Sequence, residues 1–90
     1  MKLRWSETAA SHLEEIYEFI ALHNANAALA TVDKLLAAID RLTAYPQLGR
    51  PAHGGKRKLV RKPFVVVYSV DADVVNIEAV FHGKRKYPEN

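Results

Sequence analysis

The residues best suited to binding an anion lie near the middle of the chain. Five of the seven residues from 56 to 62 are Lys or Arg. Such a cluster binds phosphates nonspecifically, because each contact releases a counterion. An acidic protein segment would use the same charges, so the cluster predicts an anionic partner without distinguishing nucleic acid from protein. The predicted binding surface comprises Arg50, Lys56, Arg57, Lys58, Lys62, Lys84 and Lys86.

Each basic candidate also has a structural interpretation. Arg61 and Lys62 would protect a sheet edge from aggregation by their charge, and residues 84–86 would form a solvated tail. His82 follows a predicted strand on the same face as Glu78, where it is either a titrating base or a hydrogen-bonded edge residue. The sequence leaves both interpretations open.

Neither a metal nor a cofactor is expected. The chain has no cysteine, and its four histidines include no pair four residues apart on one helix face, so a zinc site is not predicted. Asp71 and Asp73 have the position of turn residues, whereas a calcium loop would need more ligands and a downstream glutamate. Without disulfides, stability must come from packing or from a bound partner.

Length and composition indicate one domain spanning residues 1–90. A chain of 90 residues is too short to build a second core. No stretch reaches the roughly 18 apolar residues needed to cross a bilayer, and the start of the chain lacks the apolar run of a signal peptide. We therefore expect a cytoplasmic protein with no membrane partner.

Charge is distributed unevenly along the chain, although its net value is only +3. Residues 1–45 hold four Lys or Arg against six Asp or Glu, whereas residues 46–90 hold nine against four. The basic second half agrees with an acidic or polyanionic partner.

Two amphipathic helices are predicted in the first half. Residues 2–5 alternate as a short strand does, and Ser6 is placed to cap the helix that follows. A second helix should begin near Asn24 or Asn26 and end at Tyr45, because proline follows. The two helices should form an antiparallel hairpin. Their predicted apolar stripes comprise Leu13, Ile16, Tyr17 and Ile20, and Ala28, Val32, Leu35, Leu36, Ile39 and Leu42.

The second half predicts an antiparallel meander of strands. Residues 46–56, rich in proline and glycine, indicate an exposed connection. Residues 58–61, 64–70 and 74–81 have the pattern of strands, with a three-residue turn at 71–73.

Alternation along the last strand predicts which of its faces is buried. Val75, Ile77, Ala79 and Phe81 should share the core face. The order β-α-α-β-β-β then predicts an α+β fold, with the helix hairpin packed on one face of a small antiparallel sheet. The strand that pairs with residues 2–5 cannot be assigned from the sequence.

Four segments, taken in order, resemble the RelE/ParE family of bacterial toxins. They are Trp5-Ser6 before the first helix, residues 45–51 after the second, the strand at 64–70, and residues 82–85 near the end. The resemblance covers nearly the whole chain, and the combination is more specific than any one segment. It implies a growth-inhibiting toxin of a type II toxin–antitoxin, plasmid-stabilisation-like module, neutralised by a cognate antitoxin protein.

The family has two branches with different targets. RelE-like members cleave messenger RNA in the ribosomal A site by attack of the RNA's own 2′-hydroxyl, whereas ParE-like members lack this activity and poison DNA gyrase. RNA cleavage needs a base, an acid and cations for the developing charge. Here Arg61 and Arg85 resemble the two arginines of the nuclease branch, and His82 and Tyr87 are candidates for proton transfer. Tyr87 departs from the pattern, because it follows Arg85 by only two positions.

The resemblance favours a ParE-like toxin acting on DNA gyrase, because residues 46–51 and 82–85 look more like that branch and the nuclease set is incomplete. One alternative is a RelE-like, metal-independent mRNA endonuclease (mRNA interferase) that acts on the ribosome. The other is an RNA- or protein-binding module with no toxic activity.

Overall fold

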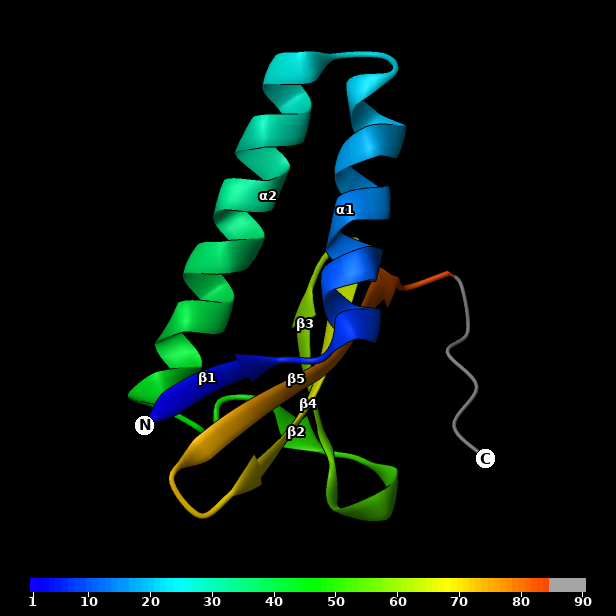
Figure 1. Ribbon diagram of the computed structural model, residues 1–90. Coiled ribbons are helices and arrows are strands. Elements are labelled where there is room, and N and C mark those ends of the chain that lie inside the picture. Colours follow the sequence, from blue (N-terminus) through cyan, green and yellow to red (C-terminus); the bar gives the residue numbers. More distant parts are fainter. Residues whose placement is uncertain (85–90) are drawn as a thin grey trace.

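The computed structural model describes residues 1–84 and consists of two helices and five strands (Figure 1). The elements are β1 (Lys2–Trp5), α1 (Glu7–Ala21), α2 (Ala25–Asp40), β2 (Arg50–Pro51), β3 (Arg57–Arg61), β4 (Phe64–Asp71) and β5 (Val74–His82). Two short 3-10 turns lie at Arg41–Thr43 and His53–Gly55. The predicted α+β fold is therefore confirmed, with β2 as an additional short strand.

The first strand joins the sheet in parallel. The strand order is β1-β5-β4-β3-β2, and Lys2 pairs with Val74 and Trp5 with Ile77. The other neighbouring strands are antiparallel, as predicted. The sheet is therefore mixed rather than wholly antiparallel. A parallel pair needs a long crossover connection, and the two helices are part of that connection here.

Polar side chains begin both helices, as the sequence predicts. The Ala9 N–H donates to the Ser6 hydroxyl oxygen (2.9 Å), and the Ala27 N–H donates to Asn24 Oδ1 (3.0 Å). Each bond satisfies an N–H group that the first helical turn leaves without a partner. Only residues 22–24 separate α1 from α2, so the helices form the predicted hairpin. Within residues 1–84, neither helix is long and apolar enough to cross a bilayer.

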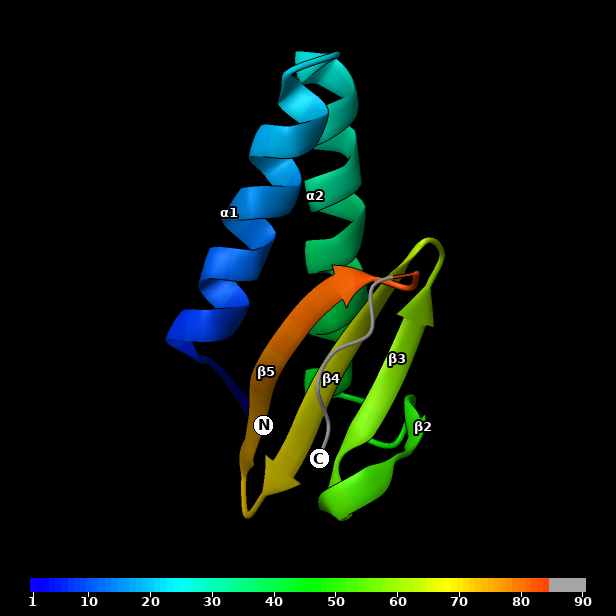
Figure 2. The same cartoon turned by 90° about the vertical axis from the view of Figure 1, so that its right-hand side faces the viewer.

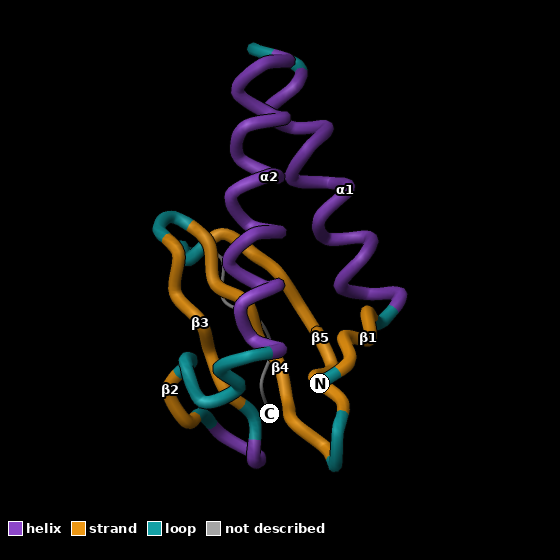
Figure 3. The backbone as a smooth tube through the Cα atoms, turned by 90° about the vertical axis from the view of Figure 1, so that its left-hand side faces the viewer, coloured by secondary structure: helices purple, strands orange, loops and turns teal. Residues whose placement is uncertain are grey.

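The helix hairpin covers one face of the sheet, and its connection stands beyond the sheet (Figures 2 and 3). We call the opposite sheet face the outer face. The core lies between the two layers. Its buried side chains are Ala9, Leu35, Ala38, Ile39, Leu42, Leu59, Phe64, Val66, Tyr68, Val75, Ile77 and Val80.

Most residues of the predicted helix stripes pack inward, but Leu36 does not. Leu35 and Ile39 are buried, and Leu13 packs against the same core. Leu36 is 40% exposed, so its placement on the buried face is wrong. It points roughly 100° around the helix from Leu35, which is enough to reach solvent.

A bulge in β5 changes the predicted faces of that strand. The register between β4 and β5 shifts at Glu78, which has no residue opposite it. Beyond the bulge Val80 joins the core cluster. The prediction that Ala79 and Phe81 share the core face is therefore wrong, because the extra residue reverses the alternation. Ala79 is buried on the outer face instead.

Two connections are tighter than the sequence predicts. Asp71 pairs with Val74, so the β4–β5 hairpin has a two-residue loop rather than three residues. Ala72 in that loop has a φ of 54°. The exposed connection expected at 46–56 contains β2 and the buried Gly49, so part of it is packed against the sheet.

Neighbouring leucines in α2 provide a test of this core. Replacing Leu35, which is 3% exposed, with alanine should lower the free energy of unfolding by about 2–5 kcal/mol, because a buried side chain leaves a cavity. The matched control Leu36→Ala should cost less than about 1 kcal/mol. Chemical denaturation of both variants gives the comparison, and equal midpoints would show that Leu35 is not part of the core.

Candidate functional site

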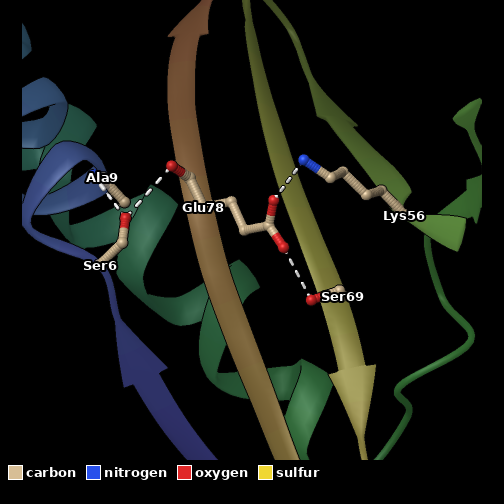
Figure 4. Close-up of polar contacts among 5 residues, drawn as sticks. All are labelled: Ser6, Ala9, Lys56, Ser69 and Glu78. Atoms are coloured by element: carbon tan, nitrogen blue, oxygen red, sulfur yellow. Dashed lines mark hydrogen bonds and ion pairs between the residues drawn. The ribbon is translucent and has the colours of Figure 1, made fainter. Parts of the chain in front are cut away.

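Three polar side chains from different parts of the sheet meet on the outer face. Lys56 Nζ lies 2.7 Å from Glu78 Oε1, and the Ser69 hydroxyl donates to Glu78 Oε2 at 2.8 Å (Figure 4). Lys56 precedes β3, Ser69 lies in β4 and Glu78 is the bulge residue of β5. The side chains of Lys56 and Glu78 are 42% and 28% exposed, so water reaches the group.

The environment of Glu78 stabilises its ionised form. Partial burial raises the pKa of the Glu78 carboxyl, but hydrogen bonds from Lys56 and Ser69 and the charge of Lys56 lower it by more. The net pKa therefore lies below its ordinary value of 4.5. Glu78 is a carboxylate at neutral pH and a poor candidate for a general base.

The same stretch of β5 fixes the start of α1. Where β1 ends, the Ser6 N–H donates to the Ile77 carbonyl (3.0 Å) and the Ser6 hydroxyl donates to the Glu78 carbonyl (3.2 Å; Figure 4). Further along α1, His12 Nδ1 accepts from the Val80 N–H at 3.2 Å. Beyond the end of β1, Ser6 and His12 therefore form the hydrogen bonds with the edge of β5. His12 is a structural acceptor at this position.

A tyrosine holds the loop between α2 and β2 against the sheet. The Tyr68 hydroxyl donates to the Pro46 carbonyl (2.7 Å) and accepts from the Gly49 N–H (2.8 Å). A Cβ atom at Gly49 would lie 2.7 Å from the Tyr68 ring and 2.8 Å from the Lys58 carbonyl oxygen, so a side chain does not fit there. Arg57 Nη1 donates to the Gly49 carbonyl at 2.7 Å.

The basic cluster predicted from the sequence is divided between the two faces of the sheet. Lys58 lies beside the buried Leu59 in β3 and therefore points to the outer face, on the same side as Lys56. Arg57 points to the helix side and bonds the carbonyl of Gly49, so it holds the loop. The five cations do not form one patch, because side chains alternate along a strand.

Two candidates for nuclease chemistry lie at one end of the sheet on the helix side. Arg61 pairs with Phe64, and Phe64 pairs with His82. The Phe64 and His82 rings meet edge to face with centroids 5.7 Å apart. Arg61 and His82 are thus separated by two strand spacings, on the order of 10 Å. The phenylalanine lies between them.

Arg61 and His82 each form a hydrogen bond with a nearby backbone group. Arg61 Nη1 donates to the carbonyl of Val60 at 2.9 Å, and the Lys84 N–H donates to His82 Nδ1 at 3.1 Å. These contacts give Arg61 and His82 structural partners within their own segments. Arg50, Lys62 and Lys84 are exposed. Arg85, Lys86 and Tyr87 lie outside the described residues.

Ser69 and Glu78 are site residues that the sequence does not single out. Glu78 is one glutamate in a strand of alternating residues, and Ser69 is one small polar residue among valines. Of the three residues, only Lys56 is indicated by the sequence, because it belongs to the basic cluster at residues 56–62. Among residues 1–84, no three His, Cys, Asp or Glu side chains are grouped so as to hold a metal ion.

Two helices on one face of a mixed five-stranded sheet define a small α+β protein. The family model described as the ParE toxin of the type II toxin–antitoxin system, parDE, matches residues 3–87. The chain therefore belongs to the ParE toxin family.

Similar proteins agree with this assignment. "Putative toxin Y4kP" of Sinorhizobium fredii is 32% identical over 91 residues, covering 98% of this chain and 94% of the relative. A structure titled the chromosomal ParDE TA system from P. aeruginosa superimposes with a TM-score of 0.80 at 27% identity, covering 91% of this chain and 95% of that chain.

A more distant structure shares the fold. The toxin–antitoxin complex RelBE2 from Mycobacterium tuberculosis gives a TM-score of 0.65 at 22% identity, covering 90% of this chain and 95% of that chain. At this identity the likeness concerns the fold alone.

Replacing Tyr68 with phenylalanine should lower the free energy of unfolding by about 1–3 kcal/mol, because the Gly49 N–H and the Pro46 carbonyl lose their partner. Tyr45→Phe is the control: it removes the hydroxyl of a tyrosine that is 59% exposed and should change stability by less than about 0.5 kcal/mol. Urea denaturation measures both changes. A Tyr68→Phe protein as stable as the Tyr45→Phe protein would mean that the hydroxyl does not fix the loop.

The lowered pKa of Glu78 predicts an acid-sensitive contribution to stability. A carboxyl group with a lower pKa in the folded state stabilises the fold above its unfolded pKa, and this stabilisation is lost as pH falls through the folded pKa. The difference in unfolding free energy between the protein and its Glu78→Gln variant should therefore be full at neutral pH and shrink below the ordinary value of 4.5. Denaturation at a series of pH values gives the curve. A difference that stays constant down to acid pH would contradict the lowered pKa of Glu78.

Proposed function

We propose that this toxin is held inactive by a cognate antitoxin protein and that, when free, it acts on DNA gyrase. The observation that carries the proposal is the branch of the family that matches: the ParE model extends over residues 3–87. Of the two toxin–antitoxin structures compared, the ParDE system also has the higher TM-score and identity. ParE-like toxins are the branch that the sequence resemblance associates with gyrase.

Apolar side chains at the free end of the helix hairpin support a protein partner. Phe19, Leu22 and Leu29 are 69%, 81% and 52% exposed. Binding of a partner that removes such side chains from water lowers the free energy. The solved structure that superimposes with a TM-score of 0.80 is titled a ParDE TA system, which supports an antitoxin as that partner.

A ribosome-dependent mRNA endonuclease is the second candidate function. It is favoured by the position of Arg61 and His82 at one end and on one side of the sheet. Against it, Phe64 separates the two side chains and each of them bonds a neighbouring backbone group. The described residues therefore support contact with a target better than they support phosphoryl chemistry.

Expression of the chain alone and together with a candidate antitoxin, sought as a small open reading frame beside its gene, would test the proposal. Growth should stop on expression of the chain alone and resume on co-expression of the antitoxin. The purified chain should inhibit gyrase supercoiling or trap cleaved DNA, while messenger RNA on translating ribosomes stays intact by primer extension.

The other outcomes are equally specific. Codon-specific cuts in messenger RNA would replace gyrase by the ribosome as target; Arg61→Ala should then lower the cleavage rate about 10²–10³-fold, with the exposed Arg4→Ala as control. Undisturbed growth with a folded, soluble chain would instead indicate a binding module with no toxic activity.

A further inference from the structure

The contact of Lys56 and Ser69 with Glu78 has the form of an occupied binding site. Both oxygens of one carboxylate are held, Oε1 by the Lys56 ammonium at 2.7 Å and Oε2 by the Ser69 hydroxyl at 2.8 Å (Figure 4). A charged donor just before β3 and a neutral donor on β4 are groups that suit a carboxylate ligand. Here the ligand comes from the chain itself.

Alternation along β5 places Glu78 on the outer face, because its neighbour Ile77 lies in the core. The bulge changes the residues that follow: without the extra residue, the side chains beyond it would alternate in the opposite sense. With it, Val80 as well as Ile77 lies in the core, and Glu78 remains next to Ser69. The group is exposed enough for exchange, since the Lys56 side chain is 42% accessible to solvent.

We propose that Lys56 and Ser69 form a subsite for a carboxylate side chain of an acidic protein segment, and that Glu78 occupies this subsite as an internal competitor until such a segment displaces it. The inference rests on the proposed function only in expecting a protein partner. Displacement exchanges one carboxylate for another. The exchange therefore costs little free energy of desolvation. The subsite selects a protein segment by the position of its carboxylate.

The donors around Glu78 favour a carboxylate over a nucleic acid. A phosphate backbone needs a track of cations along its path. In the described part of the chain, Lys56 and Lys58 point to this face, and the pairing of Arg50 with Lys58 and of Arg4 with Asn76 directs those arginines to it as well. Glu78 lies in β5, between the cations of β1 and those of β2 and β3, and interrupts such a track. The ammonium group and the hydroxyl that hold both oxygens of one carboxylate suit an isolated acidic side chain.

Removal of the competing charge provides the test. A fluorescently labelled poly-L-glutamate peptide is titrated against the purified full chain and against Glu78→Gln at low and high salt. The variant should bind the peptide roughly two- to five-fold more tightly at low salt, the range expected for one exposed ion pair. Addition of Lys56→Met to the variant should abolish the gain, and addition of Ser69→Ala should reduce it.

Glu14→Gln is the matched control, because it removes the same charge from an exposed position on α1. A gain as large in Glu14→Gln as in Glu78→Gln would reduce the effect to net charge and overturn the proposal. Glu78→Ala serves as a second variant if the glutamine amide itself fills the subsite. Circular dichroism checks that each variant is folded.

Two further results would also overturn the proposal. One is unchanged peptide affinity in both folded Glu78 variants. The other is a gain for a single-stranded RNA oligonucleotide of equal charge with none for the peptide, which would identify a phosphate site. Neither measurement reads growth or gyrase, so a failure here is distinguishable from a failure of the proposed target.

Discussion

The bulge at Glu78 is the constraint on which most of the structure depends. It places Ile77 and Val80 in the core although they are three residues apart, while the Glu78 side chain lies on the outer face. Its backbone is used as well: the Glu78 carbonyl accepts from Ser6, and the Val80 N–H donates to His12. This stretch of β5 therefore contributes to the core, to the start of α1 and to the polar group on the opposite face.

Features with a local cause could be predicted from the sequence. Ser6 caps α1 because its hydroxyl reaches an N–H three residues away, and Leu35 is buried because its stripe repeats with the helical period. The bulge left no signal, since the alternation on either side of Glu78 looks regular. The parallel pairing of β1 with β5 depends on residues more than seventy positions apart, which periodicity does not relate.

The candidate site was predicted less well than the fold, for two physical reasons. The basic cluster was identified, but period-two alternation divides it between the faces, and this division could have been read from Leu59 as an apolar residue among the cations. Ser69 and Glu78 meet because β4 pairs with β5 and Ser69 lies opposite Asn76, two residues from Glu78. Geometry of that kind arises from tertiary pairing, and the residue types alone do not encode it.

The position of β5 has a consequence for synthesis of the toxin. This strand lies between β1 and β4, so the residues made first have no strand to pair with until residues 74–77 have left the ribosome. Contacts at such large sequence separation form late, and they reduce the rate of folding. The growing chain therefore stays without its sheet during most of translation. The two edges of this sheet, β1 and β2, are therefore joined into one layer only after β5 has been made.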